Sequence, residues 1–253
     1  MFAETHKEGE NMFDVVDLHN HSLYGLDDGA DSYEKMCQMI DCSYRNGVRH
    51  ICFTPHYHNI GNRDCTPEKI GAVYNEARRY CAEHYPDLRL SVGSEMVYHF
   101  DCIDAIAEKR VLTLSESRYV LTDFLATPDA RGIMMGVERL LGCGYFPVVA
   151  HVERYDCLLG KVDEVRRLSD AGAVIQINAG SLNGGIFSKK RRFCMKLLEE
   201  ELVDVVASDA HNTDSRPPSL DFALKTVVSK FGEEYAERIF RLIPEKIMSN
   251  QRM

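Results

Sequence analysis

The sequence has no long apolar run and no C-x-x-C pair. Its longest apolar stretches, such as 203–207, fall far short of the roughly 18 residues that a membrane span needs, so we expect no direct membrane insertion. The first thirteen residues mix acids, a lysine and small polar groups, unlike a signal peptide, so we do not expect export. Nine cysteines, an odd number without close pairing, are typical of reduced thiols in a cytoplasmic protein.

Basic residues are also in short supply. Asp and Glu outnumber Lys and Arg by 39 to 30, which gives a formal net charge of -9. Because non-specific nucleic-acid binding depends on a basic surface, we expect no nucleic-acid partner. An anionic substrate would need local cations, either bound metal ions or a few arginines. No cysteine has an arginine six positions later, which excludes a cysteine-nucleophile phosphatase of the C-x5-R kind.

No repeat, low-complexity tract or linker divides the chain, so we predict one domain, 14–253, after an N-terminal extension, 1–13. Short apolar runs alternate with helical patterns, which predicts an α/β fold with a parallel sheet, open or closed into a barrel. Two helices are expected to begin at a capping box, Asp31 to Glu34, and at Thr66-Pro67. Strands are expected at 15–19, 50–54, 89–95, 119–124, 147–151, 174–179 and 203–208, and further helices at 131–141, 162–170, 189–200 and 220–230.

Potential metal ligands follow the carboxyl ends of these strands. His19 and His21 end the first strand, and residues two apart on a strand point to the same side. Asp209 and His211 repeat this spacing after the last strand. In a barrel the carboxyl ends converge on one face, where catalytic groups collect. The predicted ligands are His19, His21, Asp28, His56, Glu95, Asp123, His151, Asp209 and His211.

The number of these residues is more informative than any one of them. A single strand-end His or Asp is more often a capping or hydrogen-bonding group than a ligand. Nine together are hard to explain structurally, because buried unpaired charges are costly. Imidazoles and carboxylates without thiolates suit Mn, Fe or Zn. In a site with several ions, Glu95 is the expected bridging ligand.

Two arginines are candidates for binding a phosphate. Arg154 lies three residues past His151, and Arg216 five past His211, so both belong to loops at the predicted metal face. The guanidinium fork matches phosphate oxygens two at a time. Surface salt bridges are the alternative explanation for each. Asn178 and Ser181, after the sixth strand, are weaker polar candidates.

The motifs DLHNH, LDDGA, TPHYH, GSEM, AHVERY and SDAHN followed by SRPP together resemble the PHP (polymerase and histidinol phosphatase) superfamily. More closely, they are similar to its bacterial protein-tyrosine phosphatases of the CpsB/YwqE type, from about residue 14 to the C-terminus. The resemblance implies a distorted seven-stranded (β/α) TIM-like barrel, the PHP fold. It also implies up to three metal ions per chain, Mn²⁺ first, with Fe or Zn as alternatives.

Carried over motif by motif, the resemblance implies three ligand sets. They are His19, His21, Glu95 and Asp209; then Glu95, Asp123 and His151; and then Asp28, His56 and His211. Arg154 and Arg216 match the positions that bind the substrate phosphate. The family has glutamate where this chain has Asp123, whose side chain is one methylene shorter.

The resemblance implies a metal-dependent phosphomonoester hydrolase, most directly a protein-tyrosine phosphatase. Its substrate would be a phosphotyrosine protein, an autophosphorylating tyrosine kinase in the control of capsule or exopolysaccharide biosynthesis. Histidinol-phosphate phosphatase is an alternative in the same superfamily. Amidohydrolase-like C–N cleavage is another, although no predicted strand end supplies the metal-bridging lysine that it usually needs. A non-catalytic, metal-binding regulatory module is the third.

Overall fold

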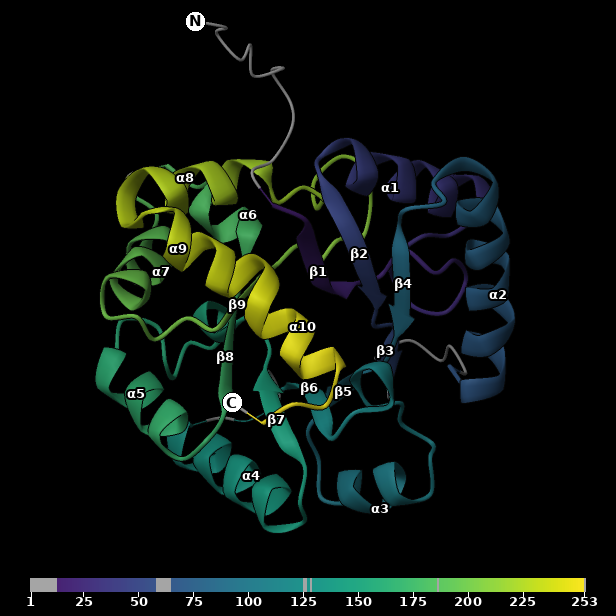
Figure 1. Ribbon diagram of the computed structural model, residues 1–253. Helices are drawn as coiled ribbons and strands as arrows, with labels where there is room; N and C mark the ends of the chain where they lie inside the picture. Colours follow the sequence, from purple (N-terminus) through teal and green to yellow (C-terminus); the bar gives the residue numbers. More distant parts are fainter. Residues whose placement is uncertain (1–12, 58–64, 125–126, 128, 186, 253) are drawn as a thin grey trace, which may run out of the picture.

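The computed structural model describes residues 13–57, 65–124, 127, 129–185 and 187–252. Within these ranges the strands are all parallel, and helices cover them on the outside (Figure 1). The expected α/β fold with parallel strands is therefore confirmed. The predicted extension, 1–13, lies outside the described residues except for Phe13. None of the described helices is both long and apolar enough to cross a membrane.

Every strand expected from the sequence is present, and one of them is interrupted. The predicted strand at 89–95 is divided at Gly93 and Ser94, and a short strand at His56–Tyr57 was not predicted. The seven predicted stretches therefore correspond to eight of the nine strands in the described residues. The nine strands are β1 (Val15–Asn20), β2 (Val48–Phe53), β3 (His56–Tyr57), β4 (Arg89–Val92), β5 (Glu95–Val97), β6 (Tyr119–Asp123), β7 (Phe146–Val149), β8 (Val174–Asn178) and β9 (Val205–Ala207).

The strands form two sheets, in the orders β1-β2-β4 and β3-β5-β6-β7-β8-β9. The sheets meet where β1 and β9 end, through an isolated parallel bridge between Asn20 and Ala210. There the backbone N–H of Asp209 donates to the carbonyl of His19 at 2.9 Å, and that of His21 to Ala210 at 2.9 Å. Among the described residues this is a local contact and no continuous ladder, so a closed seven-stranded barrel is not confirmed.

The predicted helices agree with the observed ones to within a residue or two. Thr66 caps α2, with Pro67 as its first residue. The predicted cap of α1 is wrong, because Ser32 and not Asp31 adopts the extended backbone and accepts from Lys35 N at 3.3 Å. The helices are α1 (Tyr33–Arg45), α2 (Pro67–His84), α3 (Cys102–Ala107), α4 (Ala130–Gly142), α5 (Val162–Asp170), α6 (Ala179–Leu182), α7 (Lys189–Glu199), α8 (Asp221–Phe231), α9 (Glu233–Glu237) and α10 (Ile243–Met248). Two short 3-10 helices, η1 (Leu114–Glu116) and η2 (Val152–Arg154), and one π-helix, η3 (Arg238–Leu242), complete the set.

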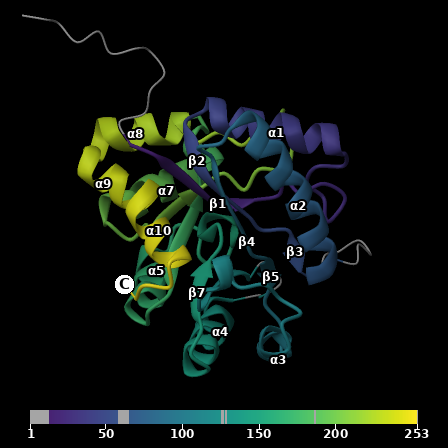
Figure 2. The same ribbon diagram turned by 45° about the vertical axis from the view of Figure 1, so that its right-hand side comes forward.

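The space enclosed by the strands is apolar at their amino ends. Helix α10 covers this end (Figure 2), where the Tyr119 hydroxyl at the start of β6 donates to Gln251 O at 2.9 Å. Apolar residues of β1, β2, β6, β7, β8 and β9 form one buried cluster with α10. Burial of such side chains stabilises the fold by about 25 cal/mol per Å². The carboxyl ends are thereby left as the open end of this enclosed space.

Candidate metal centre

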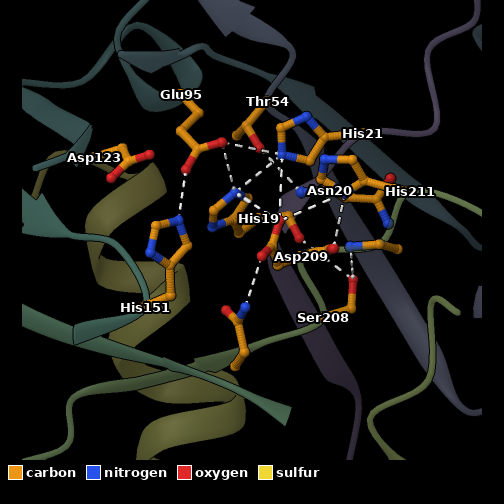
Figure 3. Close-up of polar contacts among 12 residues, drawn as sticks. His19, Asn20, His21, Thr54, Glu95, Asp123, His151, Ser208, Asp209 and His211 are labelled. Atoms are coloured by element: carbon orange, nitrogen blue, oxygen red, sulfur yellow. Dashed lines mark hydrogen bonds and ion pairs between the residues drawn. The ribbon is translucent and has the colours of Figure 1, made fainter. Parts of the chain in front are cut away.

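The nine predicted ligands come together at the carboxyl ends of the strands, and Figure 3 labels all of them except Asp28 and His56. Strands far apart along the chain contribute, since β1, β5, β6 and the segments after β7 and β9 each supply at least one side chain. Four groups have ligand atoms within 4.8 Å of one another. They are His19, His21, Glu95 and Asp209; Glu95, Asp123 and His151; His21, His56 and His211; and Asp27, Asp28 and His56.

The central group consists of two imidazoles and two carboxylates that are entirely buried. The Nε2 atoms of His19 and His21 lie 3.0 Å apart. Glu95 Oε2 lies 3.2 Å from each of them, and Asp209 Oδ1 lies 3.4 and 3.6 Å away. The two imidazole nitrogens therefore face each other and two anionic oxygens across a common space. Such a cluster is stable only if a positive charge occupies or adjoins it.

Hydrogen bonds on the far side of each ring determine which nitrogen faces this space. His19 Nδ1 lies 3.2 Å from Gln176 Oε1, and His21 Nδ1 lies 2.7 Å from Asp27 Oδ2. Because both partners are acceptors, each Nδ1 carries the proton. The Nε2 lone pair is then available for a metal ion, as in many carboxylate–histidine–metal arrangements.

Unpaired oxygens inside the cluster support the same conclusion. Glu95 Oε2 and Asp209 Oδ1 are buried, and neither accepts a hydrogen bond from a described residue. Buried carboxylate oxygens without a donor are rare in folded proteins, and each requires an explanation. Imidazole nitrogens and carboxylate oxygens are the donor set of Mn, Fe and Zn sites. The residues present therefore fit a bound transition-metal ion.

The second group surrounds Glu95 on its other side. Glu95 Oε1 lies 2.9 Å from His151 Nε2, while its Oε2 faces the central group, so one carboxylate adjoins both groups. Asp123 completes the set. The Tyr155 hydroxyl donates to Asp123 Oδ1 at 3.3 Å and accepts from the Phe124 N–H at 3.0 Å. Burial raises the pKa of Tyr155 well above its usual value, which keeps it a neutral donor.

The other two groups share His56 and lie at the solvent side. Asp28 Oδ1 is 3.4 Å from His56 Nε2 and 3.4 Å from His211 Nε2. The His211 Nδ1–H donates to the backbone carbonyl of Asp209 at 3.0 Å, which leaves Nε2 unprotonated. The Asp28 side chain is 61% exposed, whereas the ligands of the central group are buried. This part of the site is therefore the one most accessible to water and substrate.

The loop after β1 folds back on His21, and its glycine makes this possible. A Cβ atom on Gly29 would lie 2.0 Å from the His21 carbonyl oxygen, so only glycine fits. Asp27 organises the same loop, because its carboxylate accepts from Gly29 N at 2.9 Å and from His56 N at 2.9 Å. The LDDGA motif therefore places one carboxylate behind His21 and the next, Asp28, beside His56.

Two of the ligand residues have unusual backbone conformations. His151 (φ 34°) and Asp209 (φ 52°) both lie in the left-handed region, which non-glycine residues seldom adopt. The surrounding structure holds them there, since His151 N donates to Gln176 Oε1 at 2.8 Å and Asp209 N to His19 O at 2.9 Å. Strain of this kind costs about 1–3 kcal/mol per residue and is concentrated at functional sites.

The charges of the cluster depend on one another. Burial lowers the pKa of His21, but the carboxylate of Asp27 outweighs it and raises the value to about 9. Burial likewise lowers the pKa of His56, and Glu95 raises it to about 11. Burial raises the pKa of Glu95, yet His19 and His56 hold it well below its usual range. Without an ion, protons on these imidazoles balance the carboxylates, so metal binding must displace them.

The predicted phosphate-binding arginines lie on the other side of Asp209. Its Oδ2 atom is 3.0 Å from Arg154 Nη1 and 2.6 Å from Arg216 Nη2, and it accepts from Asn178 Nδ2 at 2.6 Å. Both guanidinium groups are about one-third exposed. One carboxylate thus faces the histidines with Oδ1 and holds two arginines with Oδ2. Ser181, by contrast, does not reach the ligands, because its hydroxyl donates to Glu153 Oε1 at 2.7 Å.

Several residues that position the ligands were missed from the sequence. Asp27 holds His21, Gln176 holds His19 and His151, and Glu153 accepts from Asn178 N at 3.0 Å. Gln176 could have been found from the sequence, since it is a lone amide in the otherwise apolar run VIQI. Asp27 carried a weaker one, as the second acid of a DD pair.

A pocket of about 560 Å³ adjoins the arginines. It extends from Arg154, Asp209 and Arg216 at one end towards the start of α7 and the start of α8, where Phe222 is 47% exposed. Ligand pockets in proteins typically measure about 300–1,000 Å³. The pocket is therefore large enough for a substrate group that extends beyond a phosphoryl group.

Comparison with known proteins gives consistent results. A family model described as "Capsular polysaccharide synthesis, CpsB/CapC" matches residues 15–249. The chain is 36% identical over 242 residues to the tyrosine-protein phosphatase CpsB of Streptococcus pneumoniae, which covers 94% of this chain and 99% of that protein. It is 31% identical over 221 residues to the tyrosine-protein phosphatase YwqE of Bacillus subtilis, covering 87% and 86%.

Solved structures agree at two levels. One structure superimposes with a TM-score of 0.86 at 29% identity. It is described as belonging to YwqE from Bacillus subtilis and CpsB from Streptococcus pneumoniae, "unique metal-dependent tyrosine phosphatases". It covers 94% of this chain and 96% of the other. A histidinol phosphate phosphatase from Lactococcus lactis superimposes with a TM-score of 0.52 at 15% identity, covering 78% and 86%. At that identity the second likeness concerns the fold alone.

Proposed function

The chain belongs to the CpsB/CapC family of capsular polysaccharide synthesis proteins, and from this premise we propose that it is a metal-dependent protein-tyrosine phosphatase. The observation that carries the proposal is the position of Asp209. Its carboxylate lies between a cluster of imidazoles that fits metal ions and two arginines that fit a phosphate. Neither the imidazole cluster nor the pair of arginines alone indicates phosphate-ester hydrolysis. Their common contact with the Asp209 carboxylate does.

The proposed ligand sets divide the nine residues among three ions. His19, His21, Glu95 and Asp209 would hold one ion, Glu95, Asp123 and His151 a second, and Asp28, His56 and His211 a third. When bound, the ions supply Lewis-acid activation of the phosphoryl group and of the attacking water. We infer Mn²⁺ as the first choice, with Fe or Zn as alternatives, because the donors are imidazoles and carboxylates without thiolate.

The protein's own residues orient the substrate. Arg154 and Arg216 are about one-third exposed and reach the pocket, so they can turn from Asp209 to the equatorial phosphoryl oxygens. Asn178 keeps its hydrogen bond to Asp209 Oδ2 and so holds the carboxylate when the arginines leave. The phenol of a tyrosine would then lie in the pocket towards Phe222, which offers an apolar wall.

The broader role follows the family. We propose that the substrate is an autophosphorylating tyrosine kinase of capsule or exopolysaccharide synthesis, and that both proteins act in the cytoplasm. The structure contains no disulfide among its described residues, which is consistent with a reducing compartment. We further propose that the two sheets, which contact each other at Asn20 and Ala210, act as one distorted seven-stranded barrel that brings all strand ends to one face.

The decisive test compares metal dependence with substrate choice. Chelation should abolish hydrolysis of p-nitrophenyl phosphate and of a phosphotyrosine peptide, and added Mn²⁺ should restore both. Activity that survives complete removal of metal would contradict the proposal. Turnover of histidinol phosphate well above that of the phosphotyrosine peptide would favour the small-molecule alternative. Bound metal without turnover of either substrate would favour a regulatory module.

A pair of variants separates the two roles. His151→Ala should lose both bound metal and turnover, because His151 faces Glu95 within the cluster. Arg154→Ala should keep its metal and lose phosphate affinity, because Arg154 contacts only the outer oxygen of Asp209. Metal content measured by elemental analysis, together with KM for p-nitrophenyl phosphate, distinguishes them. Equal loss of metal in both variants would show that the assigned roles are wrong.

A further inference from the structure

The pocket beside the arginines holds more cationic charge than one phosphate requires. Arg154, Arg216 and Lys190, the second residue of α7, all line it. At about 560 Å³ the pocket exceeds the needs of a phosphoryl group, which the two arginines would bind. Lys190 is therefore available to bind a part of the substrate other than the phosphoryl group that is cleaved.

Lys190 is exposed, and no hydrogen bond or ion pair joins it to any other residue that the structure describes. Two other cations of the same helix have partners. Lys196 lies 2.8 Å from Glu200 Oε1, and Arg191 Nε donates to Leu182 O at 3.0 Å. The bond of Arg191 holds the start of α7 in place, so Lys190 is presented to the pocket by a well-anchored helix.

The acids that line the same pocket do not neutralise it. Asp209 is buried and already contacts both arginines. Asp214 is the other acidic residue of the lining, and it is exposed. Three cations thus face two acids in a chain whose formal net charge is -9. The side chains that line this pocket therefore carry a small excess of positive charge, which favours an anionic group.

We propose that Lys190 binds a second negative group of the protein substrate, located close in sequence to the phosphotyrosine. The group is either the carboxylate of a neighbouring Asp or Glu or a further phosphoryl group, since an ammonium pairs with both. The proposal rests on the proposed function, because it assumes that a phosphotyrosine peptide occupies the pocket. Lys190 is a specificity-determining residue in this reaction and has no part in the chemical step.

Lys189 provides a matched control. It is equally exposed and precedes Lys190 in α7, but it lines a different hollow, of about 530 Å³, together with Arg192 and Lys196. Reversing the charge of Lys189 changes the net charge of the protein by the same amount. It does so outside the pocket that holds the arginines, so the comparison separates a contact from a general electrostatic effect.

The experiment uses the full chain loaded with Mn²⁺ and three phosphotyrosine peptides. One has neutral flanking residues, one has glutamates beside the phosphotyrosine, and one has a second phosphotyrosine. The wild type should show higher kcat/KM for the charged peptides, mainly through a lower KM. An exposed ion pair contributes little, so Lys190→Glu should reduce this preference by about fivefold. Lys190→Arg should retain it, and Lys189→Glu should change it less than twofold.

Each result has a definite meaning. A preference for the doubly phosphorylated peptide alone identifies a phosphoryl group, and a preference for both charged peptides identifies any anion. The proposal is overturned if Lys190→Glu leaves the preference unchanged or if Lys189→Glu reduces it equally. It is also overturned if Lys190→Glu weakens binding of the protein to phosphatidylserine vesicles and leaves the peptide preference unchanged. That result would assign the lysine to a membrane surface. If the wild type hydrolyses p-nitrophenyl phosphate but none of the peptides, the role proposed for Lys190 is wrong, whereas metal-dependent hydrolysis of a phosphate ester still holds.

Discussion

The two ends of the space enclosed by the strands have opposite chemistry, although the same strands build both. At the amino ends Val16, Val205 and Ile247 belong to a cluster that is entirely apolar. At the carboxyl ends His19, Glu95 and their partners are just as deeply buried, but their side chains are polar and ionisable. Glu95 even lies opposite Leu121 in the register of β5 and β6. The change from apolar to ionisable side chains therefore occurs between directly paired residues of neighbouring strands.

Asp17 marks the boundary between the two ends. It is fully buried, and its carboxylate accepts from Ser208 N at 2.9 Å, Ser208 Oγ at 2.6 Å and Asn20 Nδ2 at 2.9 Å. Every hydrogen bond of this aspartate is made within the protein. Glu95 Oε2 and Asp209 Oδ1, one layer further on, have none. This difference in hydrogen bonding distinguishes Asp17, a structural carboxylate, from Glu95 and Asp209, which fit the role of metal ligands.

If the carboxyl end is organised for ions and phosphate, Asp209→Ala should have the largest effect on turnover. The change removes an oxygen from the imidazole cluster and the shared partner of Arg154 and Arg216. We expect kcat for p-nitrophenyl phosphate to fall by roughly a hundred- to a thousandfold, the loss typical of one electrostatic group in an active site.

Asp214→Ala serves as the control, because Asp214 lines the same pocket but is exposed and belongs to none of the ligand groups found among the described residues. It should retain most of its turnover. If Asp209→Ala instead retains both metal and activity, the charged end does not depend on its central carboxylate, and the comparison fails.

Asp27→Asn should have an intermediate effect, because Asp27 acts through His21. An amide there is a weaker acceptor for the Nδ1 proton, so metal affinity should fall by about 10- to 100-fold. Excess Mn²⁺ should restore turnover, which a titration of activity against metal concentration measures. Asp31→Asn, in an exposed position just after the same loop, should not shift that titration. Loss of turnover that no metal concentration restores would contradict a positioning role.

Ile247→Ala, at the apolar end, should affect turnover least and stability most. The deletion leaves a cavity in a fully buried cluster, which typically costs about 2–5 kcal/mol of the free energy of unfolding. Urea denaturation of the wild type and the variant measures this loss, and the partly exposed Leu242→Ala is the control. Turnover per folded molecule should stay within about twofold. A larger fall would mean that the two ends are coupled through the strands.

The sequence predicted the strands because parallel strands are buried on both sides and therefore read as unbroken apolar runs. It predicted the ligands because polar residues directly after such runs are conspicuous. It did not predict the two-residue strand at His56–Tyr57, which is too short and polar to form an apolar run, or the break at Gly93 and Ser94 within the predicted strand 89–95. It also misplaced the cap of α1, because Asp31 and Ser32 are both good capping residues and only the backbone decides between them.

Residues that act on another residue were harder to find than the ligands. Gln176 contacts His19 and His151, which are far from it along the chain, and no local pattern encodes such a contact. Glu153 follows His151 closely and could be taken for a ligand, yet it faces Ser181 and the backbone of Asn178. Side-chain direction after a strand depends on the turn that follows, and here that turn begins with a left-handed residue.

The attachment of both arginines to Asp209 has a consequence for the kinetics. Inorganic phosphate, as product, must compete with an internal carboxylate for Arg154 and Arg216, and that carboxylate never diffuses away. Such an internal competitor weakens product affinity and hastens release, while a substrate gains additional contacts through its peptide. Product inhibition by phosphate should accordingly be weak, and substrate discrimination should depend on the groups attached to the phosphate.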